Sequence, residues 1–280
     1  MKPDLARRRV AATAAALIAS VGWSAHAEIK SGDNPEASEI WQKVRASLFE
    51  QRPIVNVTDD TLVLDAPVRA VDAAVVPIAM HLRLPQTATS HVEKLYLIID
   101  NNPSPIAAIF SFTPQSGRAD IETRVRVDEY SFVRAIAETR DGRLLMRTRF
   151  VKASGGCSAP PAKDAQEALA SMGKVGLRVD GPVLLNQPVL AQLQISHPND
   201  SGMVMDQATR QYTPPHFIRK IDVTYNGRLV LSADIDFAIS ENPHLRFYFV
   251  PQEGGGEMHA DVVDTQDLHF ERSFSVSQMR

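Results

Sequence analysis

The stretch Ser154-Gly155-Gly156-Cys157-Ser158-Ala159-Pro160-Pro161 divides this chain of 280 residues into two segments of β-type sequence, and it holds the only cysteine. A single thiol cannot form a disulfide within its own chain, so it is either free or paired with another molecule. Its neighbours are small or turn-forming residues, which a core strand would not contain. The stretch therefore predicts a loop that presents a functional thiol between two β domains.

The upstream segment, residues 61–151, consists of short β-type runs separated by turn signals. Residues 121–127 alternate between apolar or β-branched side chains and charged ones (Glu122, Arg124 and Arg126), which is typical of a half-buried strand with the charged face in solvent. Arg140-Asp141-Gly142 predicts a hairpin turn. Pro77 suggests an edge position or a bulge. The predicted strands include 75–83, 92–100, 106–112, 121–127, 132–137 and 144–151.

A helix is predicted ahead of these strands. Asp33-Asn34-Pro35 supplies a capping residue and a proline for the first helical position. Ile40, Trp41, Val44 and Leu48 then recur at helical spacing. We expect this helix to cover the edge or face of a sheet.

The downstream segment is a second β series. Its predicted strands are 176–180, 189–196, 217–225, 229–235, 245–250, 258–263 and 269–276. Asn226-Gly227 predicts a two-residue hairpin turn, and residues 164–172 could form two helical turns before Gly173. About seven strands in about 100 residues, in each half, are typical of a sandwich of immunoglobulin type. The fold class is therefore all-β, with two immunoglobulin-like β-sandwich domains in tandem and a short N-terminal helix.

The N-terminus has the features of an export signal. Arg7-Arg8-Arg9 precede a short apolar run, and Ala25-His26-Ala27 fits a cleavage site before Glu28. The expected location is the periplasm. The domain boundaries predicted from these features are a signal peptide at 1–27, a first sandwich at 28–153, a thiol-bearing arm and linker at 154–174, and a second sandwich at 175–280. The net charge of -3 favours neither nucleic acid nor an anionic membrane as partner.

Other site chemistries find little support in the sequence. None of the histidines has the helical spacing of a zinc-protease motif, and there is no second cysteine, so we expect surface or hydrogen-bonded histidines and no metal. Gly254-Gly255-Gly256 lies between predicted strands without a following helix and is expected to be a hairpin loop, not a phosphate-binding loop. No cofactor is predicted.

Cys157 is therefore the candidate functional residue. Gly155 and Gly156 would let its segment bend, and a thiolate is both a good nucleophile and a good covalent tether. A catalytic cysteine needs a base held in fixed geometry, which a glycine-rich linker provides poorly. These features favour a non-enzymatic carrier in which Cys157 is the covalent attachment site.

Several motifs resemble the SoxY and SoxZ proteins of bacterial thiosulfate oxidation. The upstream half resembles SoxY through Val75-Val76-Pro77, Asp100-Asn101-Asn102-Pro103 and Val151-Lys152 followed by Gly155-Gly156-Cys157. The downstream half resembles SoxZ. Its matching motifs are Ile195-Ser196-His197-Pro198, Gly202, Pro215-His216-Phe217-Ile218, Val223-Thr224-Tyr225-Asn226-Gly227, Asn242-Pro243 and Phe247-Tyr248-Phe249.

The resemblance implies immunoglobulin-like sandwiches in intramolecular contact and a cysteine arm that carries sulfur intermediates. The chain is similar to fused SoxYZ-like carriers associated with quinoprotein dehydrogenases, which implies periplasmic redox partners: a cytochrome c, a quinoprotein dehydrogenase or Sox-type enzymes. The arm of SoxY is a free C-terminal tail, whereas Cys157 is followed by a whole domain. The arm predicted here is tethered at both ends, and its reach is reduced.

Two alternatives stay open at this stage. The chain could be a structural adaptor for a periplasmic dehydrogenase or a cytochrome c, in which case Cys157 would be dispensable. It could instead be a thiol enzyme, which requires a lowered pKa for Cys157 and a nearby base such as His197 or His216.

Overall fold

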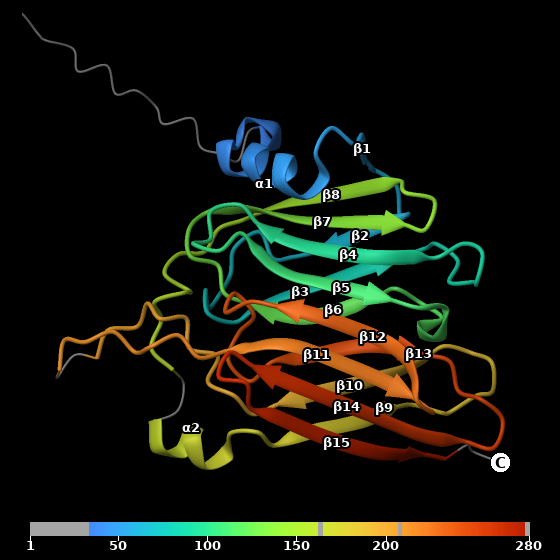
Figure 1. Cartoon of the computed structure of the whole chain (residues 1–280). Coiled ribbons are helices and arrows are strands. Elements are labelled where there is room, and N and C mark those ends of the chain that lie inside the picture. Colours follow the sequence, from blue (N-terminus) through green and yellow to red (C-terminus); the bar gives the residue numbers. More distant parts are fainter. Residues whose placement is uncertain (1–33, 162–164, 207–208, 278–280) are drawn as a thin grey trace, which may run out of the picture. The chain divides into compact units, whose positions relative to one another are not determined.

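The computed structural model describes residues 34–161, 165–206 and 209–277, which form an all-β sandwich of two sheets with one short helix near the N-terminal end (Figure 1). The predicted signal peptide and the cleavage site after Ala27 lie outside the described residues, as does Asp33 of the predicted capping segment. Among the residues described, no helix combines the length and the apolar composition that crossing a bilayer requires.

Each half of the chain supplies strands to both sheets. The first half contributes β1 (Ile54–Asn56), β2 (Leu62–Asp65), β3 (Val76–Leu82), β4 (Val92–Ile99), β5 (Ile106–Phe112), β6 (Ile121–Val125), β7 (Ser131–Thr139) and β8 (Leu144–Val151). The second contributes β9 (Val175–Asp180), β10 (Val189–Ile195), β11 (Ile218–Tyr225), β12 (Arg228–Ile235), β13 (His244–Phe249), β14 (Gly256–Asp264) and β15 (His269–Val276). Every strand predicted from the sequence is confirmed within one or two residues of its ends.

The two tandem sandwiches are joined edge to edge. The larger sheet has the order β1-β8-β7-β4-β5-β12-β11-β14-β15, and the smaller one β2-β3-β6-β13-β10-β9. The boundary between the halves falls at the antiparallel pair β5–β12, from Ala108 opposite Ile235 to Phe112 opposite Leu231. In the smaller sheet β6 meets β13 only where Glu122 faces Arg246. One hydrophobic core extends through both halves.

The turn predictions follow from backbone geometry. Asn226 and Gly227 both have positive φ and join Tyr225 to its partner Arg228, as a tight hairpin turn requires. Gly254 and Gly255 also have positive φ in the loop between β13 and β14. The hairpin loop predicted there is wrong, because β13 and β14 belong to different sheets and the loop passes from one sheet to the other. Pro77 lies on β3 ahead of the part that pairs with β2, so this end of β3 has a partner strand on one side only.

The predicted helix is present as two short elements. Asn34 caps a 3₁₀ turn, Pro35–Ala37, and the Ser38 hydroxyl accepts the Trp41 N–H at 3.1 Å to cap α1 (Glu39–Phe49). Trp41 and Phe49 are buried in a second apolar cluster on the outer face of the larger sheet. The expected covering of a sheet face is confirmed.

A buried ion pair ties this helical segment to the sheet. The Arg134 guanidinium donates to both carboxylate oxygens of Asp100, at 2.8 and 2.7 Å, and to the Pro35 carbonyl at 2.6 Å. The central carbon of the Arg134 guanidinium, Cζ, lies 4.4 Å from the centre of the Trp41 ring. Such a pair is costly to break because the remaining charge would be buried without a partner.

The solvent-facing position predicted for Arg126 is wrong. Strand β6 ends at Val125, and the Arg126 side chain turns inward, where it is buried. Its guanidinium donates to the Phe237 and Ile239 carbonyls of the second half at 2.7 and 2.9 Å. The alternating pattern of residues 121–127 could not predict that Arg126 is buried, because the carbonyls that accept its hydrogen bonds lie more than 100 residues away in the sequence.

The shared core predicts that the two halves unfold together. Phe110 is fully buried on β5 opposite Ala233, and Phe110→Ala should cost about 3–5 kcal/mol of unfolding free energy. Hydrogen exchange read by peptide should show equal loss of protection in β4 and in β11. Loss confined to the first half would contradict a single cooperative unit, and the exposed-site change Leu184→Ser serves as control.

Candidate functional site

The thiol arm, residues 154–161, lies docked against both halves of the sandwich. Gly155 has a φ of +79° and donates its N–H to the Asp128 carbonyl at 2.7 Å. Gly156 donates to the Val127 carbonyl at 3.1 Å, and a Cβ at this position would lie 2.2 Å from the Ala73 carbonyl oxygen. In this conformation the two glycines therefore allow close packing of the arm. Their role in moving the arm stays a prediction.

Cys157 is buried in this docked arm, with 1% of its surface exposed. Its N–H donates to the Asp128 carboxylate at 3.1 Å, and its carbonyl accepts the Ser201 hydroxyl at 2.5 Å. Asp128 belongs to the first half and Ser201 to the second, so the site is completed only when both halves are present. The small neighbours of Cys157 indicated an exposed thiol, but loops distant in sequence cover it.

The Asn-Asn-Pro turn supports the platform beneath the arm. The Asn102 side-chain amide donates to the Arg126 carbonyl at 2.8 Å, and its side-chain oxygen accepts the Asp128 N–H at 2.9 Å. Asn102 is itself buried. The sequence marked this motif as a turn, and its spacing to residues 126–128 gave no sign of the supporting role.

The electrostatics of the docked site keep the thiol protonated. Burial raises the pKa of the Cys157 thiol to about 12, the negative charge of Asp128 adds to this, and Arg126 opposes it. Burial in turn lowers the pKa of Arg126, against the effect of the negative charge that Cys157 carries once ionised. Because the thiolate is the nucleophile, the docked conformation stores Cys157 in an unreactive form.

Next to the arm lies a cavity of about 510 Å³, with Ala159 and Pro160 of the arm in its wall. Arg126, Asp72 and Glu241 also line it, so both signs of charge face the space. Its volume lies within the range of small-molecule pockets. A group of that size would find room beside the arm.

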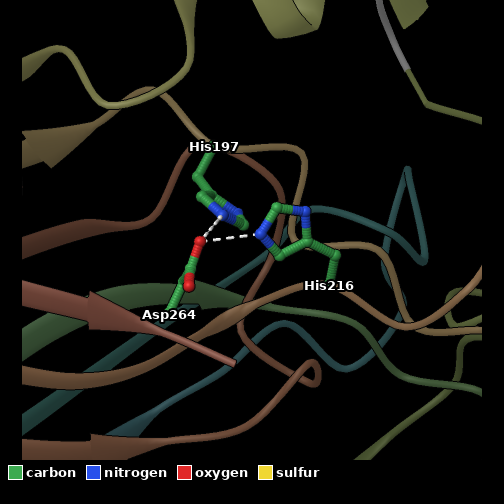
Figure 2. A group of neighbouring side chains, drawn as sticks. All are labelled: His197, His216 and Asp264. Carbon is green, nitrogen blue, oxygen red and sulfur yellow. Dashed lines mark hydrogen bonds and ion pairs between the residues drawn. The ribbon is translucent and has the colours of Figure 1, made fainter. Parts of the chain in front are cut away.

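His197 and His216 meet Asp264 in a separate buried cluster (Figure 2). His216 Nε2 lies 2.7 Å from Asp264 Oδ2, and His197 Nε2 lies 3.5 Å from the same oxygen. Burial favours the neutral acid at Asp264, but hydrogen bonds from His216 and from the backbone of Leu268 outweigh it and lower its pKa. The expectation of hydrogen-bonded histidines is confirmed for this pair.

The histidine–aspartate cluster fits a metal ion poorly. His197 Nδ1 accepts the Asn199 backbone N–H at 3.0 Å, so the proton of the neutral ring resides on Nε2. A protonated nitrogen has no lone pair for a metal. Burial, with repulsion from His216, lowers the pKa of His197 to about 4, which keeps the ring neutral. Absence of a metal remains a prediction.

Among the described residues, no hydrogen bond joins His197 or His216 to the Cys157 thiol. The charged groups that act on the Cys157 pKa are Asp128, Arg126 and Asp236, and neither His197 nor His216 is among them. His216 instead hydrogen-bonds Asp264, and His197 Nε2 lies 3.5 Å from the same carboxylate without a hydrogen bond. The hypothesis of a thiol enzyme with one of these histidines as base therefore has no support in the docked geometry.

The comparisons with known proteins match the two halves separately. The family model "Sulfur oxidation protein SoxY" matches residues 45–157, and "Sulphur oxidation protein SoxZ" matches residues 179–275. The first match ends at the cysteine. No curated protein matches the chain.

Solved structures show limited similarity. The sulfur carrier protein SoxY from Chlorobium limicola f thiosulfatophilum is 22% identical, with 40% of this chain and 94% of that chain covered and a TM-score of 0.34. A superoxide reductase (neelaredoxin) from Ignicoccus hospitalis is 15% identical, with 33% of this chain and 79% of that chain covered and a TM-score of 0.30. These scores carry no functional argument.

The first prediction from the site concerns thiol reactivity. With a pKa of about 12 in place of 9, Cys157 should react with an aromatic disulfide reagent at pH 8 roughly 1,000-fold more slowly than in the urea-unfolded chain. The rate should keep rising with pH beyond pH 9. Asp128→Asn keeps the acceptor for the Cys157 N–H but removes a charge, so it should react faster than the parent, unlike the exposed-site control Asp60→Asn. Equal rates in the folded and unfolded chains would contradict the docked arm.

A second prediction concerns acid stability. The pKa of His197 is about 4 in the fold against an ordinary 6.5, so the stability that its neutral ring contributes is present above pH 6.5 and is lost as the pH falls toward 4. The loss should be on the order of 2 kcal/mol by pH 5. His197→Asn preserves an acceptor for the Asn199 N–H but cannot titrate.

Urea unfolding at pH 7 and pH 5 checks this second prediction. The unfolding free energy of His197→Asn should change less between the two pH values than that of the parent. The exposed-site variant His269→Gln is the control. The same pH dependence in the parent and in His197→Asn would overturn the assignment of a buried neutral ring.

Proposed function

Since this chain is a fused SoxYZ-like protein, we propose that it carries a sulfur-linked intermediate covalently on Cys157 and presents it to partner oxidoreductases. The observation that carries this proposal is the position of the only thiol. Cys157 is the last residue of the SoxY match, and it lies on an arm held between the SoxY-like and the SoxZ-like halves. In this role the chain itself catalyses no reaction.

Release of the arm would activate the thiol. The docked arm is held by the N–H groups of Gly155, Gly156 and Cys157 and by the hydroxyl of Ser201. Each such hydrogen bond contributes about 1 kcal/mol net, because water replaces it on release. Away from the body, the Cys157 pKa returns toward its ordinary value of 9, and thiolate becomes available. The arm therefore alternates between a stored thiol and a reactive one.

In the loading step, the thiol of Cys157 and the terminal sulfur of an inorganic sulfur anion form one S–S bond. One proton leaves the thiol for solvent, and two electrons pass to the partner oxidoreductase. The partner is thus an electron acceptor, for which a cytochrome c, a Sox-type enzyme or a quinoprotein (PQQ) dehydrogenase system are the candidates, and the place of the reaction is the periplasm.

The double tether limits which partners fit. The chain continues from Pro161 toward α2 (Ala165–Ser171) and β9, so the arm is a loop and not a tail. A loop cannot thread its tip into a narrow channel as a free tail can. We expect a partner with an open, shallow sulfur site.

A structural adaptor is the second candidate, and the burial of Cys157 is the observation that favours it. A small buried thiol is also a common packing residue. In an adaptor, Cys157→Ser would leave function intact.

Intact-protein mass spectrometry on protein taken from its native compartment without reductant tests the proposal. We expect an adduct that reductant removes, with a mass that corresponds to added sulfur or a sulfonate. Cys157→Ser should carry no adduct and should unfold at a urea concentration close to that of the parent. An unmodified thiol under all growth conditions would establish the adaptor instead.

A further inference from the structure

Beside the arm, residues 200–206 and 209–216 form the two strands of a ribbon that lies outside both sheets. Its backbone pairs at Asp200 with His216 and at Met205 with Tyr212, and Thr213 donates its N–H to the Val204 carbonyl at 2.9 Å. Figure 1 shows this ribbon, in orange, projecting from the end of the molecule where the arm runs. We call these two stretches the projecting ribbon.

The base of the projecting ribbon is fixed rigidly next to the thiol. Asn199 is buried, donates to the Ile239 carbonyl at 2.9 Å, and accepts the Ile218 N–H at 3.0 Å. His216, at the other end, is held by Asp264. Ser201, on the first strand of the ribbon, donates its hydroxyl to the Cys157 carbonyl. The histidine–aspartate cluster thus positions the ribbon that touches the arm.

Farther out, the ribbon exposes apolar side chains. Tyr212 is 61% exposed and Met205 is 41% exposed. An isolated two-stranded ribbon has no core in which to bury such groups. Methionine and tyrosine are also well suited to protein contacts, since one adapts its shape and the other offers a large rigid surface.

The other loops that hold the arm expose apolar groups as well. Val71 is fully exposed in the loop whose Ala73 packs on Gly156, and Tyr130 is half exposed two residues after Asp128. Apolar side chains gathered around a functional group mark an interaction surface more often than scattered ones do. Here the projecting ribbon and the loops that contain Val71 and Tyr130 all contact the arm of Cys157, and each exposes apolar side chains.

We propose that Met205 and Tyr212 of the projecting ribbon, together with Val71 and Tyr130 of the other two loops that hold the arm, form the docking surface for the oxidoreductase that loads Cys157. This inference rests on the carrier function. The occupant is a protein with an apolar recess beside an open sulfur site, because a doubly tethered arm reaches only a partner bound next to it. A charged partner face would leave these four side chains without apolar partners.

The test compares enzymatic with chemical loading. Met205→Ser with Tyr212→Ser is expressed in the native host, and the fraction of protein with a reductant-sensitive adduct on Cys157 is measured by intact mass. We expect that fraction to fall at least tenfold. The same purified double variant, treated with inorganic polysulfide, should load as fast as the parent because its thiol and arm are unchanged. Leu184→Ser with Leu185→Ser removes comparable exposed apolar groups outside the three loops, and it should load normally in the host.

Each outcome decides a different point. A loaded parent and an equally loaded ribbon variant would overturn the docking surface while leaving the carrier function standing. A parent that is never loaded in the host would overturn the carrier function itself. Slower loading by polysulfide in the ribbon variant would show that the ribbon acts on the arm and not on a partner, and would also overturn the proposal.

Discussion

The antiparallel pairing of β5 with β12 joins the two halves into one sheet, and the site depends on it. With this pairing in place, the loop after β6 and the loops after β10 and β12 meet at one end of the molecule. Arg126 then places its guanidinium on carbonyls of the second half. The arm lies between Asp128 of one half and Ser201 of the other. The thiol site is therefore formed by contacts between the two halves and belongs to neither alone.

Within that site, burial affects the pKa of the Cys157 thiol more than the neighbouring charges do. Arg126 would favour a thiolate, but burial and the charge of Asp128 outweigh it and keep Cys157 protonated. Few hydrogen bonds hold the arm, so this protection is reversible at moderate cost. A carrier benefits from this balance because an idle thiolate would be oxidised or would react with the wrong partner. The same burial would suit an adaptor, and only the state of the thiol in the native compartment separates the two.

Strand prediction succeeded where a local pattern carried the information. Alternation located β6, and Asn226-Gly227 located the β11–β12 hairpin, because both signals act between near neighbours. Strand β1 could not be recognised in the sequence, since its three residues are too few to show an alternating pattern and its pairing partner is the distant strand β8. The projecting ribbon was missed for the same reason. Motifs that resembled SoxY and SoxZ indicated the family, which both family models support.

The sequence by itself determined the β class, the helix that covers a sheet, most turns, and the identity of the single thiol with its two glycines. Tertiary structure alone decided that Cys157 is buried, that Arg126 faces inward, and that His197 and His216 meet at Asp264 instead of at the thiol. The physical reason is distance along the chain. Ser201 lies 44 residues from Cys157, and Asp264 lies 48 residues from His216. Burial, charge and tautomer depend on such partners, and no local pattern specifies them.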